Sequence, residues 1–102
     1  MQEQIDTLLQ AIIDDYNRAS FPASMREEFA NGLYVKMGKK YIKIMSGHCV
    51  WGFIVNTDTD KQFRRGDILK AASWNAPARN RDRGNILDGG YRIKWTGPHC
   101  LK

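Results

Sequence analysis

The 102-residue sequence has little of several features that mark a function class at once. It contains only two cysteines and three prolines, and no apolar run approaches the roughly 20 residues of a membrane-spanning helix. The first residues, MQEQIDTLLQ, are acidic and amphipathic, whereas a secretory signal starts with basic residues followed by an apolar segment. We therefore expect no membrane partner and no disulfide framework, and we expect a protein of the cytoplasm with reduced cysteines.

The composition is that of a chain that folds. Hydrophobic residues make up 42% and charged residues 26%, and three Trp, four Tyr and four Phe provide large groups to bury. This composition argues against intrinsic disorder. The length corresponds to one domain, so residues 1–102 are expected to form a single domain.

Charge is distributed unevenly along the chain. Residues 1–32 carry six acidic and two basic side chains, a net charge of −4. Residues 33–102 carry 14 basic and five acidic side chains, a net charge of +9, so the formal +5 of the whole chain hides this asymmetry. A strongly basic segment attracts polyanions, which is the first indication of a partner.

The acidic N-terminal segment is expected to be helical. Residues 4–19 place their apolar side chains at a period near 3.6, and Pro22 prevents the helix from continuing. The apolar stripe consists of Ile5, Leu8, Leu9, Ile12, Ile13 and Tyr16. It is expected to cover a sheet, with a dimer seam or a partner's groove as the alternatives. A second short helix is expected to have Ser24 as N-cap, Glu27 completing a capping box, and a stop at Asn31–Gly32.

The basic part of the chain alternates apolar and polar residues, as β-strands do. We expect strands over residues 33–37, 40–46, 49–56, 66–72, 84–88 and 91–96. The fold class is therefore α+β, with two N-terminal helices over residues 1–32 packed on a β-rich core over residues 33–102. That core is a small antiparallel β-sheet or a partly open barrel of five to six strands.

A long loop between two of these strands carries the most unusual pattern. Residues 73–83, SWNAPARNRDR, combine a tryptophan with three arginines at alternate positions, within a tract of six cations over residues 64–83. Cations that neutralise phosphates beside an aromatic ring that stacks on a base are typical of nucleic-acid binding. The candidate phosphate-binding residues are Arg64, Arg65, Lys70, Trp74, Asn75, Arg79, Arg81 and Arg83. In the alternative interpretation, Trp74 is buried beneath a loop whose arginines only face solvent.

Residues 66–87, GDILKAASWNAPARNRDRGNIL, resemble a motif of small uncharacterised proteins encoded by tailed bacteriophages. Those proteins also have tracts similar to KYIKI at residues 40–44 and VWGFIV at residues 50–55. The resemblance covers roughly residues 39–97 and brings no assigned activity. It implies a phage protein that acts in the bacterial host cytoplasm on host machinery, nucleic acid or a defence system.

Two His-Cys pairs, His48-Cys49 and His99-Cys100, are a possible zinc-ligand set. Adjacent residues of a strand point to opposite faces, and zinc ligands usually have two or more residues between them, so we expect no metal site. A disulfide between the two cysteines is disfavoured in a reducing compartment. We expect a buried Cys49 instead.

No catalytic constellation is visible, and we expect neither an enzyme nor a cofactor. Asp67 could act as a base, with Ser73 or Cys49 as a nucleophile beside His48 or His99, but nothing in the sequence fixes their mutual geometry. Asp67 is instead expected to accept backbone hydrogen bonds in a turn.

Three functions remain open. The first is nucleic-acid binding through the basic loop; the second is inhibition or modulation of a host bacterial protein or defence system. The third is binding of a phosphorylated nucleotide by the same arginines.

Overall fold

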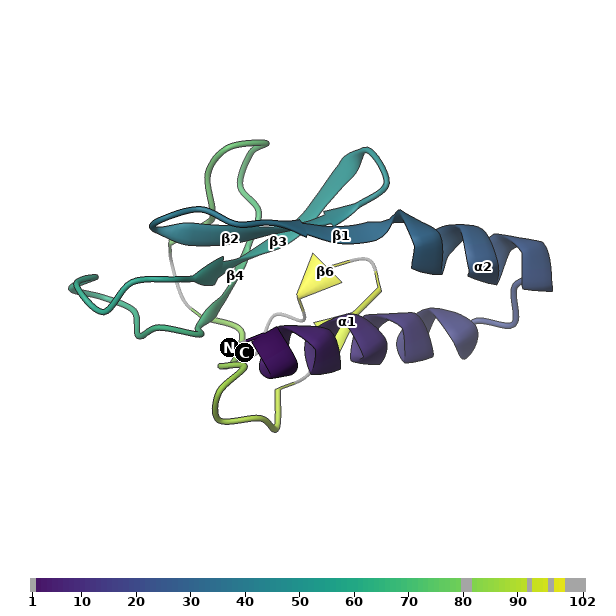
Figure 1. Cartoon of the computed structure of the whole chain (residues 1–102), viewed down its shortest axis with the longest axis horizontal. Coiled ribbons are helices and arrows are strands. Elements are labelled where there is room, and N and C mark those ends of the chain that lie inside the picture. Colours follow the sequence, from purple (N-terminus) through teal and green to yellow (C-terminus); the bar gives the residue numbers. More distant parts are fainter. Residues whose placement is uncertain (1, 80–81, 92, 96, 99–102) are drawn as a thin grey trace.

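A computed structural model describes residues 2–79, 82–91, 93–95 and 97–98. Two helices come first, α1 over Gln2–Asn17 and α2 over Ala23–Gly32, followed by strands. The strands are β1 over Leu33–Lys36, β2 over Tyr41–Ser46, β3 over Cys49–Val55, β4 over Ile68–Lys70, β5 over Ile93–Lys94 and β6 over Gly97–Pro98. Strands β1 to β4 form an open antiparallel sheet in chain order, and β5 pairs with β6 (Figure 1). The predicted α+β class is confirmed, and the sheet is open rather than a barrel.

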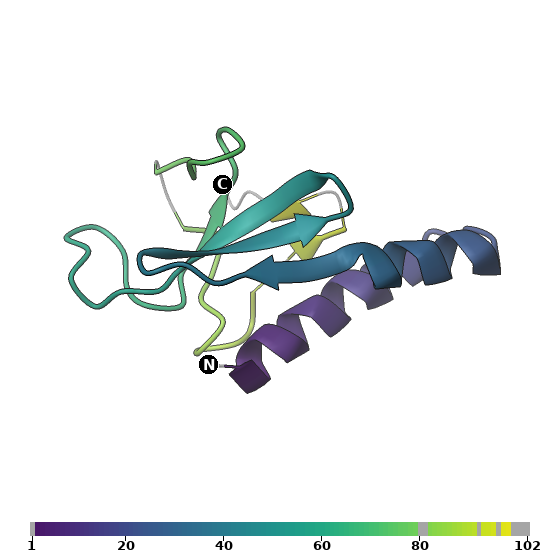
Figure 2. The ribbon, with the colours of Figure 1, turned by 45° about the horizontal axis from the view of Figure 1, so that its top comes forward.

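Helix α1 covers one face of the sheet, as its apolar stripe predicted. Ile5, Leu8, Ile12 and Tyr16 are its buried residues. The first three join a core with sheet isoleucines that include Ile42 and Ile54. In Figures 1 and 2 the helix runs beneath the sheet, while α2 leads directly into β1. Neither described helix combines the length and apolar composition that crossing a membrane requires.

The face of the sheet opposite α1 carries a second, smaller core. Phe53, Val55, Phe63 and Leu69 are buried there, with Tyr41 packed at their edge. The chain after β4 rises over this face in Figure 1. It returns through a bridge between Ala71 and Pro77. This second core is small, so the neighbouring polar side chains of β1 and β2 stay exposed on this face.

The C-terminal strands are shorter than predicted. Residues 84–88 are not a strand: Asn85 forms only an isolated bridge with Asp67, and a turn follows. The physical reason is local, because the Asn85 side-chain oxygen accepts the N–H groups of Leu87 and Asp88, at 2.8 and 3.3 Å, and bends the chain. Among the described residues of the strand predicted over residues 91–96, only Ile93–Lys94 form a strand, β5. The strand predicted over residues 66–72 is reduced to the three residues of β4.

The predicted start of α2 is also wrong. Its N-cap is Pro22, and no side chain caps it. The Pro22 carbonyl accepts the N–H groups of Met25 and Arg26 at 3.0 and 3.1 Å, so the helix begins before Ser24 can act as its cap.

Cys49 is exposed, contrary to the expectation that it would be buried. It pairs with Ser46 next to the Gly47–His48 turn, and an irregularity between Ile44 and Met45 shifts the register of this hairpin end. His99 and Cys100 lie outside the described residues.

Candidate functional site

The described cations of the basic tract predicted over residues 64–83 do not form one surface. Arg64 donates to the Asp88 carboxylate, and Arg65 forms an ion pair with Asp58 at 3.0 Å. Lys70 pairs with Gly52, which pairs with Ile44, so it belongs to the sheet face that α1 covers. Arg64 and Arg65 are thus both paired with acids of the same chain, and Lys70 lies on the sheet face that α1 covers.

Arg83 is unavailable to an external phosphate because it is only 3% exposed. Its backbone N–H donates to the Ile68 carbonyl at 2.7 Å. Its side-chain Nε and Nη1 have no hydrogen-bond partner among the residues that the structure describes. Arg79 is exposed, so alternate spacing does not place these arginines on a shared face. Arg81 lies outside the described residues.

Trp74 lies at the surface and is 48% exposed, so the alternative interpretation, in which Trp74 is buried, is wrong. The ammonium groups of Lys36 and Lys43 lie 6.0 and 4.8 Å from its ring centroid. These two lysines are opposite each other on β1 and β2, so their like charges repel. Attraction of both ammonium groups to the Trp74 ring offsets this repulsion. Asn75 adds a contact, because Lys43 Nζ donates to its side-chain oxygen at 3.4 Å. A flat aromatic group is thus held between two cations on the open sheet face.

Arg79 lies on the same side of the sheet and is held by several groups at once. Its guanidinium lies 5.0 Å from the centroid of Phe63, donates to the Tyr41 hydroxyl, and forms an ion pair with Asp60 at 2.9 Å. The Gln62 side-chain amide donates to the Arg79 carbonyl at 2.7 Å. Arg79 is therefore fixed in position and not a mobile surface cation.

Asp60 is the acid that orients Arg79. Its side chain is only 2% exposed, and it accepts the backbone N–H groups of Gln62 and Phe63 at 2.8 and 3.0 Å. The hydrogen bond from Arg79, followed by these two backbone bonds, holds the pKa of Asp60 well below its usual range. Asp60 in turn raises the pKa of Arg79. Both groups are therefore charged at neutral pH.

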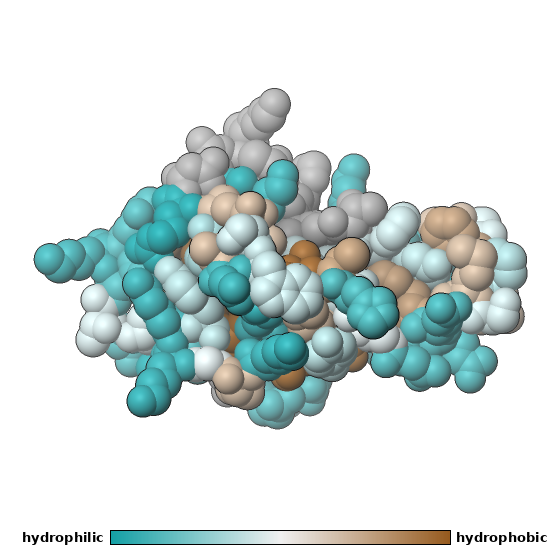
Figure 3. Space-filling view, turned by 90° about the horizontal axis from the view of Figure 1, so that it is seen from above, coloured by the Kyte–Doolittle hydropathy of each residue, from teal (hydrophilic) through white to brown (hydrophobic). Residues whose placement is uncertain are grey.

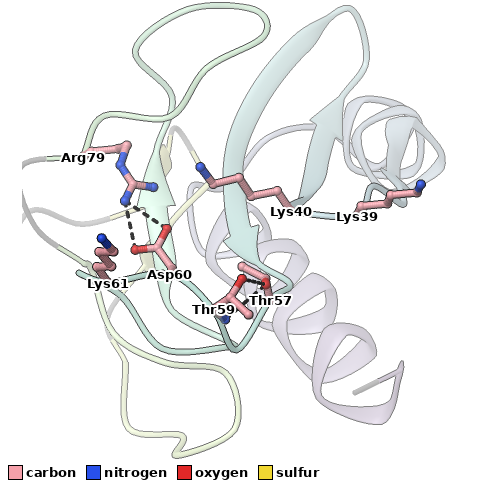
Figure 4. A pocket seen from close by; sticks show the side chains of 7 residues that line it. All are labelled: Lys39, Lys40, Thr57, Thr59, Asp60, Lys61 and Arg79. Atoms are coloured by element: carbon pink, nitrogen blue, oxygen red, sulfur yellow. Dashed lines mark hydrogen bonds and ion pairs between the residues drawn. The ribbon is translucent and has the colours of Figure 1, made fainter.

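The Arg79–Asp60 pair lines a pocket of about 520 Å³ at one end of the sheet. The other lining residues are Lys39, Lys40, Thr57, Thr59 and Lys61. In Figure 4 the Lys40 side chain extends toward the ion pair, whereas Lys39 points away from it. The hydroxyl groups of Thr57 and Thr59 are hydrogen-bonded to each other at 2.8 Å. Four cations and one acid make the lining strongly positive.

Tyr41 connects the pocket with the Trp74 cluster. Its hydroxyl accepts a bond from Arg79, and its ring meets the edge of Phe53 with centroids 5.9 Å apart. Lys43 lies 6.0 Å over the same Phe53 ring. We call the resulting surface the basic sheet face. It consists of Lys36, Lys39, Lys40, Lys43, Lys61 and Arg79, with Tyr41 and Trp74.

The basic sheet face lies on the side of the molecule shown in Figure 3, which is mostly hydrophilic with small apolar patches. Its five lysines form no ion pair with any described residue. Among the described residues that line the pocket, Asp60, already paired with Arg79, is the one acid. This arrangement presents unneutralised positive charge next to an exposed aromatic ring.

Sequence reasoning identified part of this surface. Trp74, Asn75 and Arg79 lie on it or at its edge, whereas its five lysines were missed. The alternation of residues 33–37 and 40–46 carried a signal for two of them, because it places Lys36 and Lys43 opposite the buried isoleucines. The tertiary structure brings the residues of the 56–61 loop to the pocket, and no local sequence pattern predicts this position.

The Asp60–Arg79 pair predicts a pH dependence of stability. The folded-state pKa of Asp60 is lowered, so its stabilising effect is fully present above the unfolded-state value of about 3.9 and is lost as pH falls further. Wild type should unfold at higher urea than Asp60→Asn at pH 6, and this difference should shrink progressively below about pH 4. Urea unfolding between pH 7 and pH 2.5 measures it.

Asp58→Asn is the matched control for this titration. Arg65 also lowers the pKa of Asp58, but the Asp58 side chain is 78% exposed and its ion pair is screened by water. Its loss should therefore change the pH profile less than the loss of Asp60. Equal profiles for the two variants would contradict the structural role given to Asp60.

Comparison with known proteins yields a family and no function. No curated protein and no solved structure matches the chain. A family model described as a family of unknown function, DUF7717, matches residues 1–98. The match extends over both helices, the four-stranded sheet and every residue of the basic sheet face. The chain therefore belongs to the DUF7717 family of unknown function.

Proposed function

We propose that this protein binds single-stranded nucleic acid along the basic sheet face. The observation that carries the proposal is Trp74, half-exposed and flanked by Lys36 and Lys43 on the open side of the sheet. Proteins that bind single strands combine cations that follow the phosphate backbone with aromatic rings on which bases stack. The basic sheet face offers both kinds of group side by side.

A single strand fits this surface better than a duplex. An exposed ring stacks on a base only when that base is free of its neighbours, which is the case in single strands and loops. Reading duplex DNA through the major groove requires an element that enters the groove, commonly a helix. Helix α1 is packed on the sheet through its buried residues. Helix α2 contains two acidic residues and has no basic residue in its last turn.

The charge distribution supports the approach of a nucleic acid to the basic sheet face. The acidic segment of residues 1–32 forms the two helices, and α1 lies on the opposite face of the sheet (Figure 1). The positive potential of the β-rich part is thus least offset on the face that α1 leaves open. Such a field raises the association rate with polyanions at low ionic strength.

The resemblance of residues 66–87 to tailed-bacteriophage proteins supports an action in the bacterial cytoplasm, on phage or host nucleic acid. A host protein as the partner is the competing hypothesis. The two hypotheses differ in their salt dependence, because neutralising backbone phosphates releases counterions from the nucleic acid.

The test is a titration of fluorescently labelled single-stranded DNA and RNA and of duplex DNA, at salt concentrations from 50 to 200 mM. Wild type should bind the single strands, with log affinity falling linearly with log salt. In Lys36→Ala/Lys43→Ala this slope should fall by about 0.7 for each charge removed. Lys70→Ala/Lys94→Ala is the matched control, because it removes the same charge from exposed lysines away from the basic sheet face.

A smaller slope in the Lys36/Lys43 variant, with the wild-type slope in the control, supports the proposal. Equal effects of both variants mean that overall charge and not the basic sheet face governs binding. No binding to any strand at 50 mM salt overturns the proposal and leaves a protein partner as the hypothesis to pursue.

A further inference from the structure

We infer that the pocket beside Arg79 binds the phosphomonoester group of a nucleotide. Two sources supply this chemistry: the terminal phosphate of a nucleic-acid strand and a free mononucleotide. The strand-end source rests on the proposed function, whereas the free-nucleotide source does not.

The pocket has the polar groups that a phosphate requires. Lys40 and Lys61 supply ammonium donors, and Arg79 supplies a guanidinium already held in place by Asp60, Tyr41 and Phe63. A guanidinium and ammonium groups are the side chains that form the strongest charge-assisted bonds with phosphate oxygens. At about 520 Å³ the pocket lies within the size range of small-molecule sites.

Asp60 does not cancel this attraction. Its carboxylate is almost fully shielded from solvent and is saturated by Arg79 and by two backbone N–H groups. Figure 4 shows the acid bonded to Arg79 while Lys40 extends toward the pair from the other side. The acid therefore fixes the geometry of Arg79, and the ammonium groups remain available to an incoming anion.

The charge of the pocket favours a monoester over a chain-internal phosphate. A phosphomonoester carries a charge of about −1.5 to −2 at pH 7 and exposes three acceptor oxygens. A phosphate within the strand carries a single negative charge. Lys40, Lys61 and Arg79 against the single charge of Asp60 match the higher charge and the larger number of acceptors.

The pocket is placed where a bound strand could end. Lys43 contacts the Trp74 ring, and Tyr41, two residues earlier on β2, contacts Arg79 of the pocket. Two residues of a β-strand span about 6.6 Å. A short nucleic-acid strand whose base stacks on Trp74 can thus reach the pocket with its terminal phosphate.

The experiment uses short oligo(dT) probes that carry a 5′-phosphate, a 3′-phosphate or no phosphate, each labelled away from the phosphate. Calorimetric titrations with thymidine monophosphate and with thymidine test the free nucleotide. The proteins are wild type, Lys40→Ala/Lys61→Ala, and Lys70→Ala/Lys94→Ala as the charge-matched control. All four lysines are exposed, so the variants should fold.

A terminal phosphate at one end should tighten binding to wild type about tenfold, as charge-assisted hydrogen bonds predict. This preference should disappear in Lys40→Ala/Lys61→Ala and persist in the control. Binding of thymidine monophosphate but not thymidine, lost in the same variant, supports the free-nucleotide source. If monophosphate binds while unphosphorylated strands do not, the proposed function fails and the phosphate site stands. If strands bind without any phosphate preference and monophosphate does not bind, the phosphate site is overturned while the proposed function stands.

Discussion

Replacement of Asn85 with alanine should lower the free energy of unfolding by about 3 kcal/mol. Asn85 is 5% exposed, and its side-chain amide donates to the Arg65 carbonyl at 2.9 Å and to the Asp67 carboxylate at 2.8 Å. Its side-chain oxygen accepts the N–H groups of Leu87 and Asp88. One side chain thus joins the start of β4 to the turn that follows Gly84.

The expected loss is larger than that of an average hydrogen bond because Asp67 stays behind. Asp67 is 5% exposed, and its other carboxylate oxygen accepts the Arg64 N–H at 2.9 Å. Alanine at position 85 leaves the first oxygen of this buried carboxylate without its partner, and an unsatisfied buried group costs more than the bond itself contributes. The packing is also tight, because a Cβ on Gly66, whose φ is +92°, would lie 2.8 Å from the Asn85 side-chain oxygen.

Urea unfolding followed by circular dichroism measures this prediction, with a lower midpoint and an unchanged slope expected for Asn85→Ala. Asn31→Ala is the control, because Asn31 is exposed on α2 and its loss should change stability by less than about 0.5 kcal/mol. Similar stability of the two variants would show that the Asp67–Asn85 contact does not hold the C-terminal part in place.

Asn85 also shows where sequence reasoning about the fold succeeds and where it ends. Helix α1 and strands β1 and β2 follow from the regular spacing of their apolar side chains. Strand β3 follows from a continuous apolar run, and α2, which has no buried residue, follows only from its stop signal at Asn31–Gly32. The accepting role of Asp67 in a turn was predicted correctly. Residues 84–88 contain Ile86 and Leu87 and suggested a strand, but side-chain hydrogen bonds of Asn85 decide their conformation. The Asn85 amide also donates to Asp67, 18 residues away, and neither kind of side-chain bond leaves a periodic pattern.

The candidate site shows the same division. The tryptophan and Arg79 were found because they belong to one contiguous and unusual loop. Of the predicted tract of six cations, Arg64 and Arg65 form ion pairs with Asp88 and Asp58, and Arg83 is buried, none of which the sequence indicates. The lysines of the basic sheet face come from β1, from β2 and from two loops, and only the sheet register brings them together.

Replacement of Trp74 with alanine should weaken single-strand binding by roughly 10- to 100-fold, since a stacked base contributes about 1–3 kcal/mol. Trp74 is half-exposed, so its loss should hardly change the urea midpoint. The salt slope should stay at the wild-type value because Lys36 and Lys43 remain. A lower affinity with an unchanged slope separates stacking from charge, whereas the lysine variant reduces the slope.

Two further variants make this result specific. Trp74→Phe keeps an aromatic face and should bind within a few-fold of wild type. Leu87→Ala removes another exposed apolar side chain, 46% exposed, from a turn far along the chain and should bind as wild type does. Trp51 is 4% exposed, and Trp95 packs against Tyr16 and Phe29 at the core that α1 covers. Quenching of tryptophan fluorescence by an unlabelled strand should therefore arise mainly from Trp74 and be largely lost in Trp74→Phe although the strand still binds. If quenching in Trp74→Phe is as large as in wild type, the bound bases lie near another tryptophan. The Trp74 ring then does not stack on a base, and this outcome contradicts the prediction.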